Sequence, residues 1–228
     1  MGNGVVTALD FSFLGGEPSL RHETNQPTRA ISMVWSDYIP ATLTPLYEIY
    51  DYGHAAAILA NEFPVEFGEV VAALSRFRIE KADIAAKGGN ESNIPKSFSA
   101  TLRPFGWREG KLTVETRVDG VSVKSPDTHK VDYIKGSVAL DLEWNSKDQT
   151  FDRDLYAFRT FHENKRISVG VIVTRGLEPF TQALNQIVGQ TKYGASSTWF
   201  GKLLPRLEAG RSGGCPVLAF GMKTALII

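Results

Sequence analysis

Apolar residues recur along the chain with two different periods, and together these predict a domain of mixed helices and strands. Helical spacing predicts that residues 47–78 are mostly helical, with Pro64 in a first helical turn. The apolar stripe of this segment consists of Phe63, Phe67, Val70, Val71, Leu74 and Phe77. Further helices are predicted over residues 152–163, 179–188 and 199–207.

Period-two and fully apolar segments predict the strands. Residues 111–123 alternate about Asp119-Gly120, which favours a hairpin. Residues 167–173 are apolar almost throughout, as is typical of a central strand covered on both faces. Residues 216–220 predict a last buried strand. This mixture implies an α/β architecture with a central mixed β-sheet flanked by helices.

Two segments lack any apolar period. Residues 1–45 are rich in Gly, Pro, Thr and Ser, so we expect a poorly structured N-terminal extension ahead of a single domain over residues 46–228. Residues 87–96 are expected to form a loop because they contain several Gly and Asn residues and a Pro.

A second, tighter hairpin is predicted from Lys130 to Asn145. Its two-residue loop is Gly136-Ser137, because Gly tolerates the positive φ that such a loop needs at its first central position. With this loop, Lys135 pairs with Val138, and the register of every other pair follows from these two residues.

The polar side chains of this hairpin carry the candidate chemistry. Asp132 is predicted to lie opposite Asp141, and period two places Glu143 and Asn145 on the same face as Asp141. Carboxylates with Cβ atoms about 5 Å apart repel each other. A divalent cation would explain their gathering, since Mg²⁺ binds carboxylate oxygens and keeps sites for water and phosphate. The alternative is a hairpin whose acidic face is simply solvated.

Composition narrows the choice of partner and compartment. The chain has 228 residues, of which 43% are hydrophobic, enough for one sizeable core. Its 25 Lys and Arg balance its 25 Asp and Glu, which is less typical of a nucleic-acid-binding domain. Residues 192–223 nevertheless have five basic residues against one acid. The single Cys215 suits a reducing cytoplasm, and no apolar run approaches the roughly 20 residues that span a membrane.

The acidic residues also carry a family resemblance. Asp132, eight residues, Asp141, one residue and Glu143 resemble the active-site motif of the PD-(D/E)xK nucleases. More narrowly, the chain is similar to the BglII/BstYI (BamHI-like) group of type II restriction endonucleases. The similarity covers roughly residues 46–223, and its blocks are Glu48–Ala55, Val131–Lys135, Val138–Glu143, Ile167–Val173 and Gly210–Gly221.

This resemblance implies a restriction-endonuclease-like core and cleavage of double-stranded DNA. We expect a homodimer that cuts both strands of a short palindromic site with Mg²⁺, leaving 5′ overhangs, and Mn²⁺ is expected to substitute. Asp132, Asp141 and the backbone carbonyl of Leu142 are the expected metal ligands. Glu143 stands where most of the superfamily has Lys; BglII and BstYI have Gln there and BamHI has Glu. The identity of the general base is therefore open.

Other polar residues are candidates for supporting roles. Glu69, on a predicted helix, is either an outer-shell acid of the metal site or a plain solvated glutamate, and Asn145 is a second outer-shell candidate. Four residues are either DNA contacts or ordinary surface residues: Lys87, Asn90, Lys96 and Arg211. The functions that stay open beside a restriction enzyme are a repair-type nuclease, a non-catalytic DNA-binding relative and an interaction domain.

Overall fold

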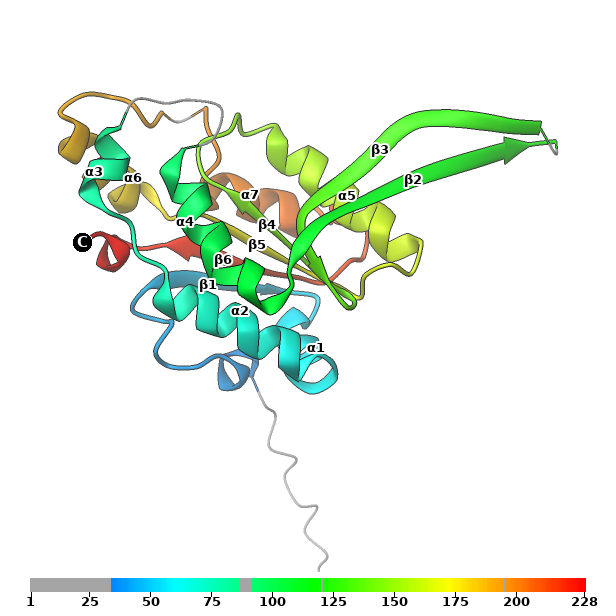
Figure 1. Cartoon of the computed structure of the whole chain (residues 1–228), viewed down its shortest axis with the longest axis horizontal. Helices are drawn as coiled ribbons and strands as arrows, with labels where there is room; N and C mark the ends of the chain where they lie inside the picture. The colour runs from blue at the N-terminus through cyan, green and yellow to red at the C-terminus, as the bar shows by residue number, and fades with distance from the viewer. Residues whose placement is uncertain (1–33, 87–91, 120, 195) are drawn as a thin grey trace, which may run out of the picture. The chain divides into compact units, whose positions relative to one another are not determined.

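A six-stranded β-sheet organises residues 34–86, 92–119, 121–194 and 196–228, which a computed structural model describes (Figure 1). Its strand order is β1-β6-β5-β4-β3-β2. The strands are β1 (Tyr47–Tyr52), β2 (Arg108–Val118), β3 (Val121–Lys135), β4 (Val138–Glu143), β5 (Val169–Arg175) and β6 (Val217–Met222). Strands β4, β5 and β6 are parallel, whereas the other neighbours are antiparallel. The predicted mixed sheet is confirmed.

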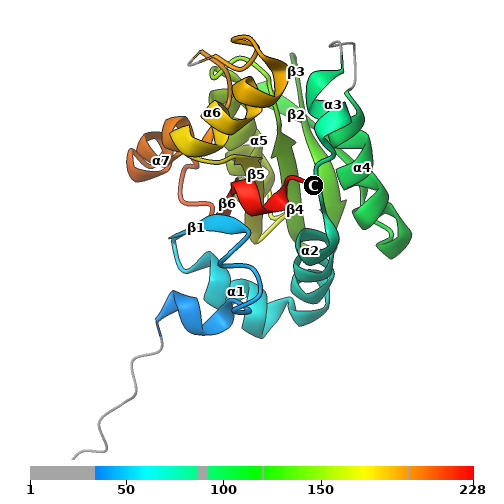
Figure 2. The same ribbon diagram turned by 90° about the vertical axis from the view of Figure 1, so that its left-hand side faces the viewer.

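Helices cover both faces of this sheet (Figure 2). The first face packs on α1 (Ala55–Glu62), α2 (Pro64–Arg76), α3 (Lys81–Ala85), α4 (Asn93–Leu102) and α6 (Glu178–Val188). The second face packs on α5 (Thr150–Glu163) and α7 (Phe200–Glu208). All seven residues of β5 are buried, as expected for a central strand. In the described ranges no helix is both long and apolar enough to cross a bilayer.

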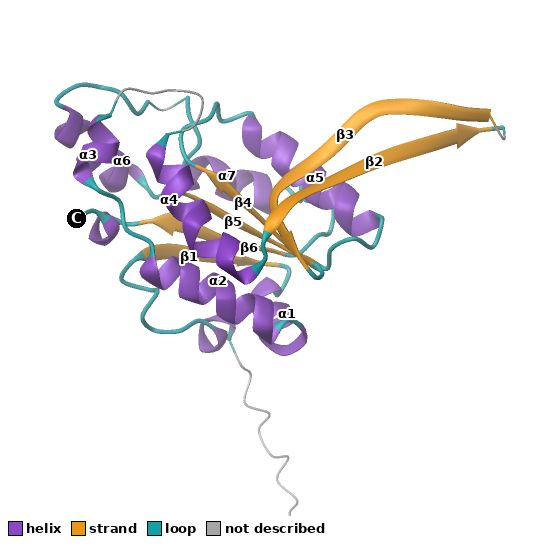
Figure 3. Ribbon diagram, in the orientation of Figure 1, coloured by secondary structure: helices purple, strands orange, loops and turns teal. Residues whose placement is uncertain are grey.

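Strands β2 and β3 continue beyond the sheet as a two-stranded arm (Figure 3). Strand β3 pairs with β4 only from Tyr133 to Lys135, and the rest of β3 pairs with β2 alone. Val118 pairs with Val121, which confirms the hairpin predicted about Asp119-Gly120. The arm therefore joins the body of the sheet just beyond Asp132, the first of the candidate acids.

Two elements differ from their prediction. Residues 47–52 form an edge strand rather than a helix, because aromatic and β-branched residues favour an extended chain and β6 offers an antiparallel partner. Residues 93–102 form α4, although Gly, Asn and Pro indicated a loop up to Lys96. Pro95 lies in the first turn, where its missing N–H has no intrahelical acceptor to lose. The buried residues of α4 include Ile94, Phe98 and Leu102, at helical spacing.

The folded unit begins earlier than residue 46. Among the described residues it already includes Trp35 and continues to Ile228. Residues 35–38 form a 3₁₀ helix, η1 (Trp35–Tyr38), and Ile39 and Leu43 are buried in the core of the first face. The segment before residue 46 has too few apolar residues to show a helix or strand period, but Ile39 and Leu43 are nevertheless part of the core. Residues 1–33, also assigned to the poorly structured extension, lie outside the described residues.

Candidate active site

The acidic hairpin has the predicted register but separates at its aspartates. Lys135 pairs with Val138, and Gly136 has the positive φ of 55° that the tight loop needs. The pairing of β3 with β4 ends at Tyr133 and Leu140, one residue short of Asp132 and Asp141. From that point β3 leaves the sheet to enter the arm.

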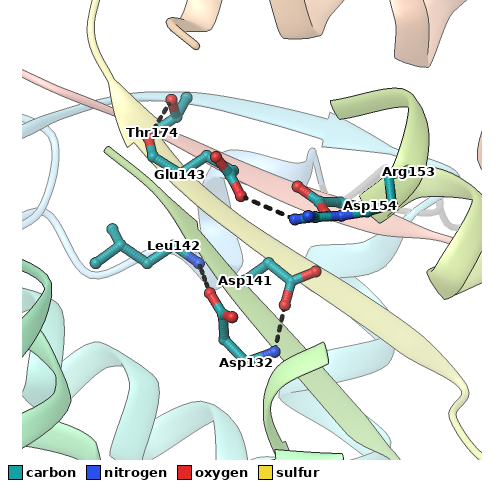
Figure 4. Close-up of polar contacts among 7 residues, drawn as sticks. All are labelled: Asp132, Asp141, Leu142, Glu143, Arg153, Asp154 and Thr174. Carbon is teal, nitrogen blue, oxygen red and sulfur yellow. Dashed lines mark hydrogen bonds and ion pairs between the residues drawn. The ribbon is translucent and has the colours of Figure 1, made fainter. Parts of the chain in front are cut away.

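The two aspartates bridge the strands where the backbone pairing ends (Figure 4). The Asp132 N–H donates to Asp141 Oδ1 at 2.6 Å, and the Leu142 N–H donates to Asp132 Oδ2 at 3.1 Å. Each carboxylate thus replaces a carbonyl that the ladder would have supplied. This exchange fixes both side chains and leaves one oxygen of each without a backbone donor.

Strand β4 directs its acids toward the second face, under the start of α5. Asp141 is 3% exposed and Glu143 is 5% exposed. Burial excludes the solvated acidic face for these two residues, whereas Asp132 and Asn145 are exposed. The Glu143 carbonyl accepts a hydrogen bond from Thr174 Oγ1 of β5 at 2.8 Å, which holds this end of β4 in the sheet.

A fourth acid, Asp154 of α5, reaches the same place and was missed in the sequence. It is 3% exposed and accepts hydrogen bonds from Arg153, whose Nη2 also lies 3.7 Å from Glu143 Oε1. The missed signal is positional: Asp154 lies three residues after Phe151 and four before Phe158, on the buried stripe of α5. An acid on an apolar helical stripe is a strong indication of a site.

These carboxylates are electrostatically strained. Burial, followed by the charges of Asp154 and Asp132, raises the pKa of Asp141 well above its usual value. Burial and then the charge of Asp154 raise the pKa of Glu143 to about 8. Burial also raises the pKa of Asp154, although Arg153 opposes this. One buried oxygen of each of these three residues has no hydrogen-bond partner: Asp141 Oδ2, Glu143 Oε2 and Asp154 Oδ2.

This donor set fits a hard divalent cation, which binds carboxylate oxygens and offsets their repulsion. Among the described residues, however, no group of three or more His, Cys, Asp and Glu side chains is arranged to hold a metal ion. The bonds from the backbone hold the Asp132 and Asp141 carboxylates apart. Side chains would therefore have to turn toward the cation as it binds.

Two hollows meet at Asp132. The larger, of about 430 Å³, is lined by Arg103, Arg108 and Trp107 among others. The smaller, of about 250 Å³, is lined by Lys130 and Arg153 together with Asp132, Asp141 and Asp154. Each hollow therefore combines basic side chains with Asp132, which is the arrangement needed to place a phosphate beside a carboxylate-bound cation.

The sequence matches the family profile described as restriction endonuclease BglII/BglIII over residues 47–222. The chain belongs to this family. It is therefore a type II, site-specific deoxyribonuclease that acts on double-stranded DNA, and the family generally uses divalent metal ions. The match runs from β1 to the end of β6, so it includes the whole sheet and all four acids. None of the curated proteins compared with the chain matches it.

In this restriction endonuclease, Glu69 is not the solvated glutamate that was the alternative. Its half-buried carboxylate accepts from Trp107 Nε1 at 2.9 Å and pairs with Lys135 Nζ at 2.5 Å. Trp107 also lines the larger hollow, so Glu69 lies behind the wall of that hollow. An outer-shell role for Glu69, and likewise for exposed Asn145, stays a prediction.

The DNA-contact candidates of this endonuclease lie in different parts of the chain. Lys96 is exposed on α4, one turn before Ser99, which lines the larger hollow. Arg211 follows α7 and forms an ion pair with Asp152 of α5. Burial raises the pKa of Asp152, but hydrogen bonds from Arg211 and Arg206 outweigh this and lower it. Lys87 and Asn90 lie outside the described residues.

Replacing Glu143 with Gln is expected to stabilise the metal-free enzyme in a pH-dependent way. With a folded pKa of about 8 against a usual 4.5, the folded state keeps a proton that the unfolded state loses between these values. The free energy of unfolding of the wild type therefore falls as pH rises through that range. The Glu143→Gln variant has no carboxyl to ionise there, so it does not lose this stability. Near pH 8 its melting temperature should exceed that of the wild type by several degrees, since each kcal/mol of stability shifts the melting temperature by roughly 2–4 °C.

Thermal unfolding followed by circular dichroism in a chelating buffer measures this difference. Near pH 5 the two proteins should melt at nearly the same temperature. Glu163→Gln, at an exposed position of helix α5, is the matched control and should melt as the wild type does at both pH values. A difference between wild type and Glu143→Gln that is the same at both pH values would contradict the shift.

Proposed function

We propose that this enzyme hydrolyses DNA phosphodiester bonds with Mg²⁺ at a PD-(D/E)xK site formed by Asp132, Asp141 and Glu143. The observation that carries the proposal is the burial of like-charged carboxylates where β3 leaves β4, with three oxygens left unpartnered. Burying carboxylates without partners destabilises a fold or makes them keep a proton that they would otherwise lose. A bound divalent cation removes that penalty, so function rather than stability accounts for the arrangement.

Asp132, Asp141 and the backbone carbonyl of Leu142 are the proposed metal ligands. The Leu142 N–H bonds to the Asp132 carboxylate, so the two ligand-bearing strands are already joined at this point. Mg²⁺ held by these residues would polarise the phosphate and lower the pKa of bound water, and Mn²⁺ should replace it because it also accepts oxygen ligands.

Glu143 is proposed to orient or deprotonate the attacking water. With its pKa raised to about 8, the carboxyl holds a proton near neutral pH in the metal-free protein. It accepts a proton only after losing this one, and a nearby cation favours that loss. Arg103 and Arg108 on one side of Asp132, and Lys130 on the other, are placed to hold the flanking phosphates.

We propose a homodimer with two-fold symmetry, and such a dimer requires a palindromic recognition sequence.

We also propose that the enzyme is cytoplasmic, because a lone thiol stays reduced there. Cys215 is buried, and burial raises the pKa of its thiol to about 12. Digestion of one long DNA with Mg²⁺, followed by sequencing of the fragment ends, tests the proposal. Discrete fragments with one common end sequence are expected, and smears or intact DNA would contradict it.

Arg211→Ala is expected to weaken binding to the cognate site. Arg211 lies in a basic turn before β6, and its half-exposed guanidinium is held by Asp152 with free donors to spare. Arg binds guanine O6 and N7 in bidentate fashion, so its loss should reduce discrimination by about 1–3 kcal/mol. Fluorescence anisotropy with cognate and random duplexes measures this.

Arg159→Ala is a matched control, since that arginine pairs with Glu163 on α5 instead. Affinity equal to that of the wild type on both duplexes would dismiss Arg211 as a DNA contact. A uniform loss on both duplexes would reduce its role to a phosphate contact.

A further inference from the structure

Helix α5 holds an acid against β4 that its own stability does not require. Phe151, Leu155, Phe158 and Phe161 of α5 are buried in the core of the second face. Asp154 lies on the same stripe and is fixed in place by these neighbours. It is the fifth residue of the helix, beyond the first turn where an acid stabilises the helix dipole, and Asp152 already fills that role. Its burial therefore needs another cause.

The contacts of Asp154 are incomplete. Arg153 Nε and Nη2 both donate to the same oxygen, Oδ1, at 3.1 and 2.9 Å. The other oxygen, Oδ2, is buried without a partner, as is Oε2 of Glu143. A guanidinium usually satisfies a carboxylate through two parallel bonds to its two oxygens. The Arg153 guanidinium therefore contacts both Asp154 and Glu143 but leaves one oxygen of each without a hydrogen bond.

Arg153 is also poorly placed as a permanent partner. Its side chain is 74% exposed, whereas those of Glu143 and Asp154 are 7% and 4% exposed. It lines the smaller hollow together with Asp141 and Asp154, and Figure 4 shows the Glu143 carboxylate turned toward it from β4. An ordinary surface ion pair has both partners in solvent. In this cluster the exposed Arg153 side chain can move away into solvent, whereas the buried acids cannot move without disturbing the core.

We propose that Glu143 and Asp154, with Asp141, form a cation site that Arg153 occupies in the metal-free enzyme and a divalent metal ion takes over. This inference rests on the proposed function, because it extends the metal site of that reaction to a residue of α5. A compact divalent ion reaches the buried oxygens that a guanidinium leaves unpartnered. Arg153 is released into the hollow, where the DNA phosphates lie in the proposed complex.

The test is Mn²⁺ binding to the full-length protein without DNA, measured by titration calorimetry. Asp154→Asn should weaken binding by about tenfold or more. Arg153→Ala should tighten it, because the metal no longer competes with a resident cation. Arg159→Ala is the matched control on the same helix, and it should bind as the wild type does.

Unchanged affinity in folded Asp154→Asn, or weaker binding in Arg153→Ala, would overturn the inference. Arg153 is mostly exposed, so Arg153→Ala is expected to fold. If Asp154→Asn does not fold, the Mn²⁺ affinity of Arg153→Ala alone tests the inference. DNA cleavage by the wild type separates the two proposals. A wild type that cuts DNA with Mg²⁺ while these variants bind Mn²⁺ normally refutes only the role of Asp154. A wild type that neither binds Mn²⁺ nor cuts DNA refutes the proposed function itself.

Discussion

Replacing Asp132 or Asp141 with Ala is expected to abolish DNA cleavage while leaving DNA binding largely intact. Both side chains lie where β3 separates from β4, and each accepts a backbone N–H of the other strand. As proposed metal ligands they act on the reacting phosphate, whereas the basic side chains of the two hollows are the proposed contacts with the DNA backbone. Loss of a ligand should lower the rate on the order of a thousandfold or more, about 4 kcal/mol.

The design must separate loss of the metal from loss of local structure. Alanine also removes the carboxylate oxygen that accepts a backbone hydrogen bond between β3 and β4. Asp132→Asn and Asp141→Asn are therefore measured as well. An amide keeps an accepting oxygen at the same place but binds a divalent cation poorly. Asp83→Asn is the matched control, because that aspartate lies on α3 and accepts a hydrogen bond from Asn93. Plasmid cleavage and duplex binding are measured for all five variants. Cleavage at the wild-type rate in any variant of Asp132 or Asp141 would refute its assignment.

Local pattern was sufficient to predict the acidic hairpin. A glycine loop and period-two alternation set its register, and the structure confirms the pairing of Lys135 with Val138. Nothing local indicates that the ladder ends one pair before Asp132, because that depends on β2 drawing β3 into the arm. Strand β1 was mistaken for helix for a similar reason, since its partner β6 lies at the far end of the chain.

The fourth acid shows a different limit. A helix was predicted from residue 152, and its apolar stripe is buried as expected. An acid on such a stripe lies either in solvent or beside other functional residues, and which of these holds depends on the strand that the helix covers. The sheet order, in which β4 lies between β3 and β5, decides this for Asp154 and is encoded by long-range contacts. Sequence spacing could show three of the acids but not that a fourth joins them.

The enzyme is expected to be a homodimer that cuts both strands of its site in one encounter. The acidic hairpin supplies one active site for each chain, yet a double-strand break needs two hydrolyses of opposite polarity. A two-fold dimer places two identical sites in the symmetry of the DNA itself. Light scattering at micromolar concentration, with and without a cognate duplex, should give twice the mass of the chain.

One exposed apolar surface of the described residues is a candidate for the interface of such a dimer. The apolar stripe of α2 is not available for a partner chain, because Phe67, Val70 and Leu74 are buried in the core of their own chain. Large apolar side chains that stay exposed near this end include Val65, at 63%, and Trp35, at 41%. Trp35 lies on η1 and Val65 on α2, and both elements pack against α1, so we take these side chains as the candidate contacts with a partner chain.

Val65→Glu tests this surface at the start of α2. If the dimer forms there, the variant should be monomeric at micromolar concentration and should nick plasmid DNA instead of linearising it. Val121→Glu is the matched control, because that valine is 67% exposed but lies at the tip of the arm. A dimeric Val65→Glu beside a monomeric Val121→Glu would move the interface to the arm. A wild type that stays monomeric while making concerted double-strand breaks would refute the dimer altogether.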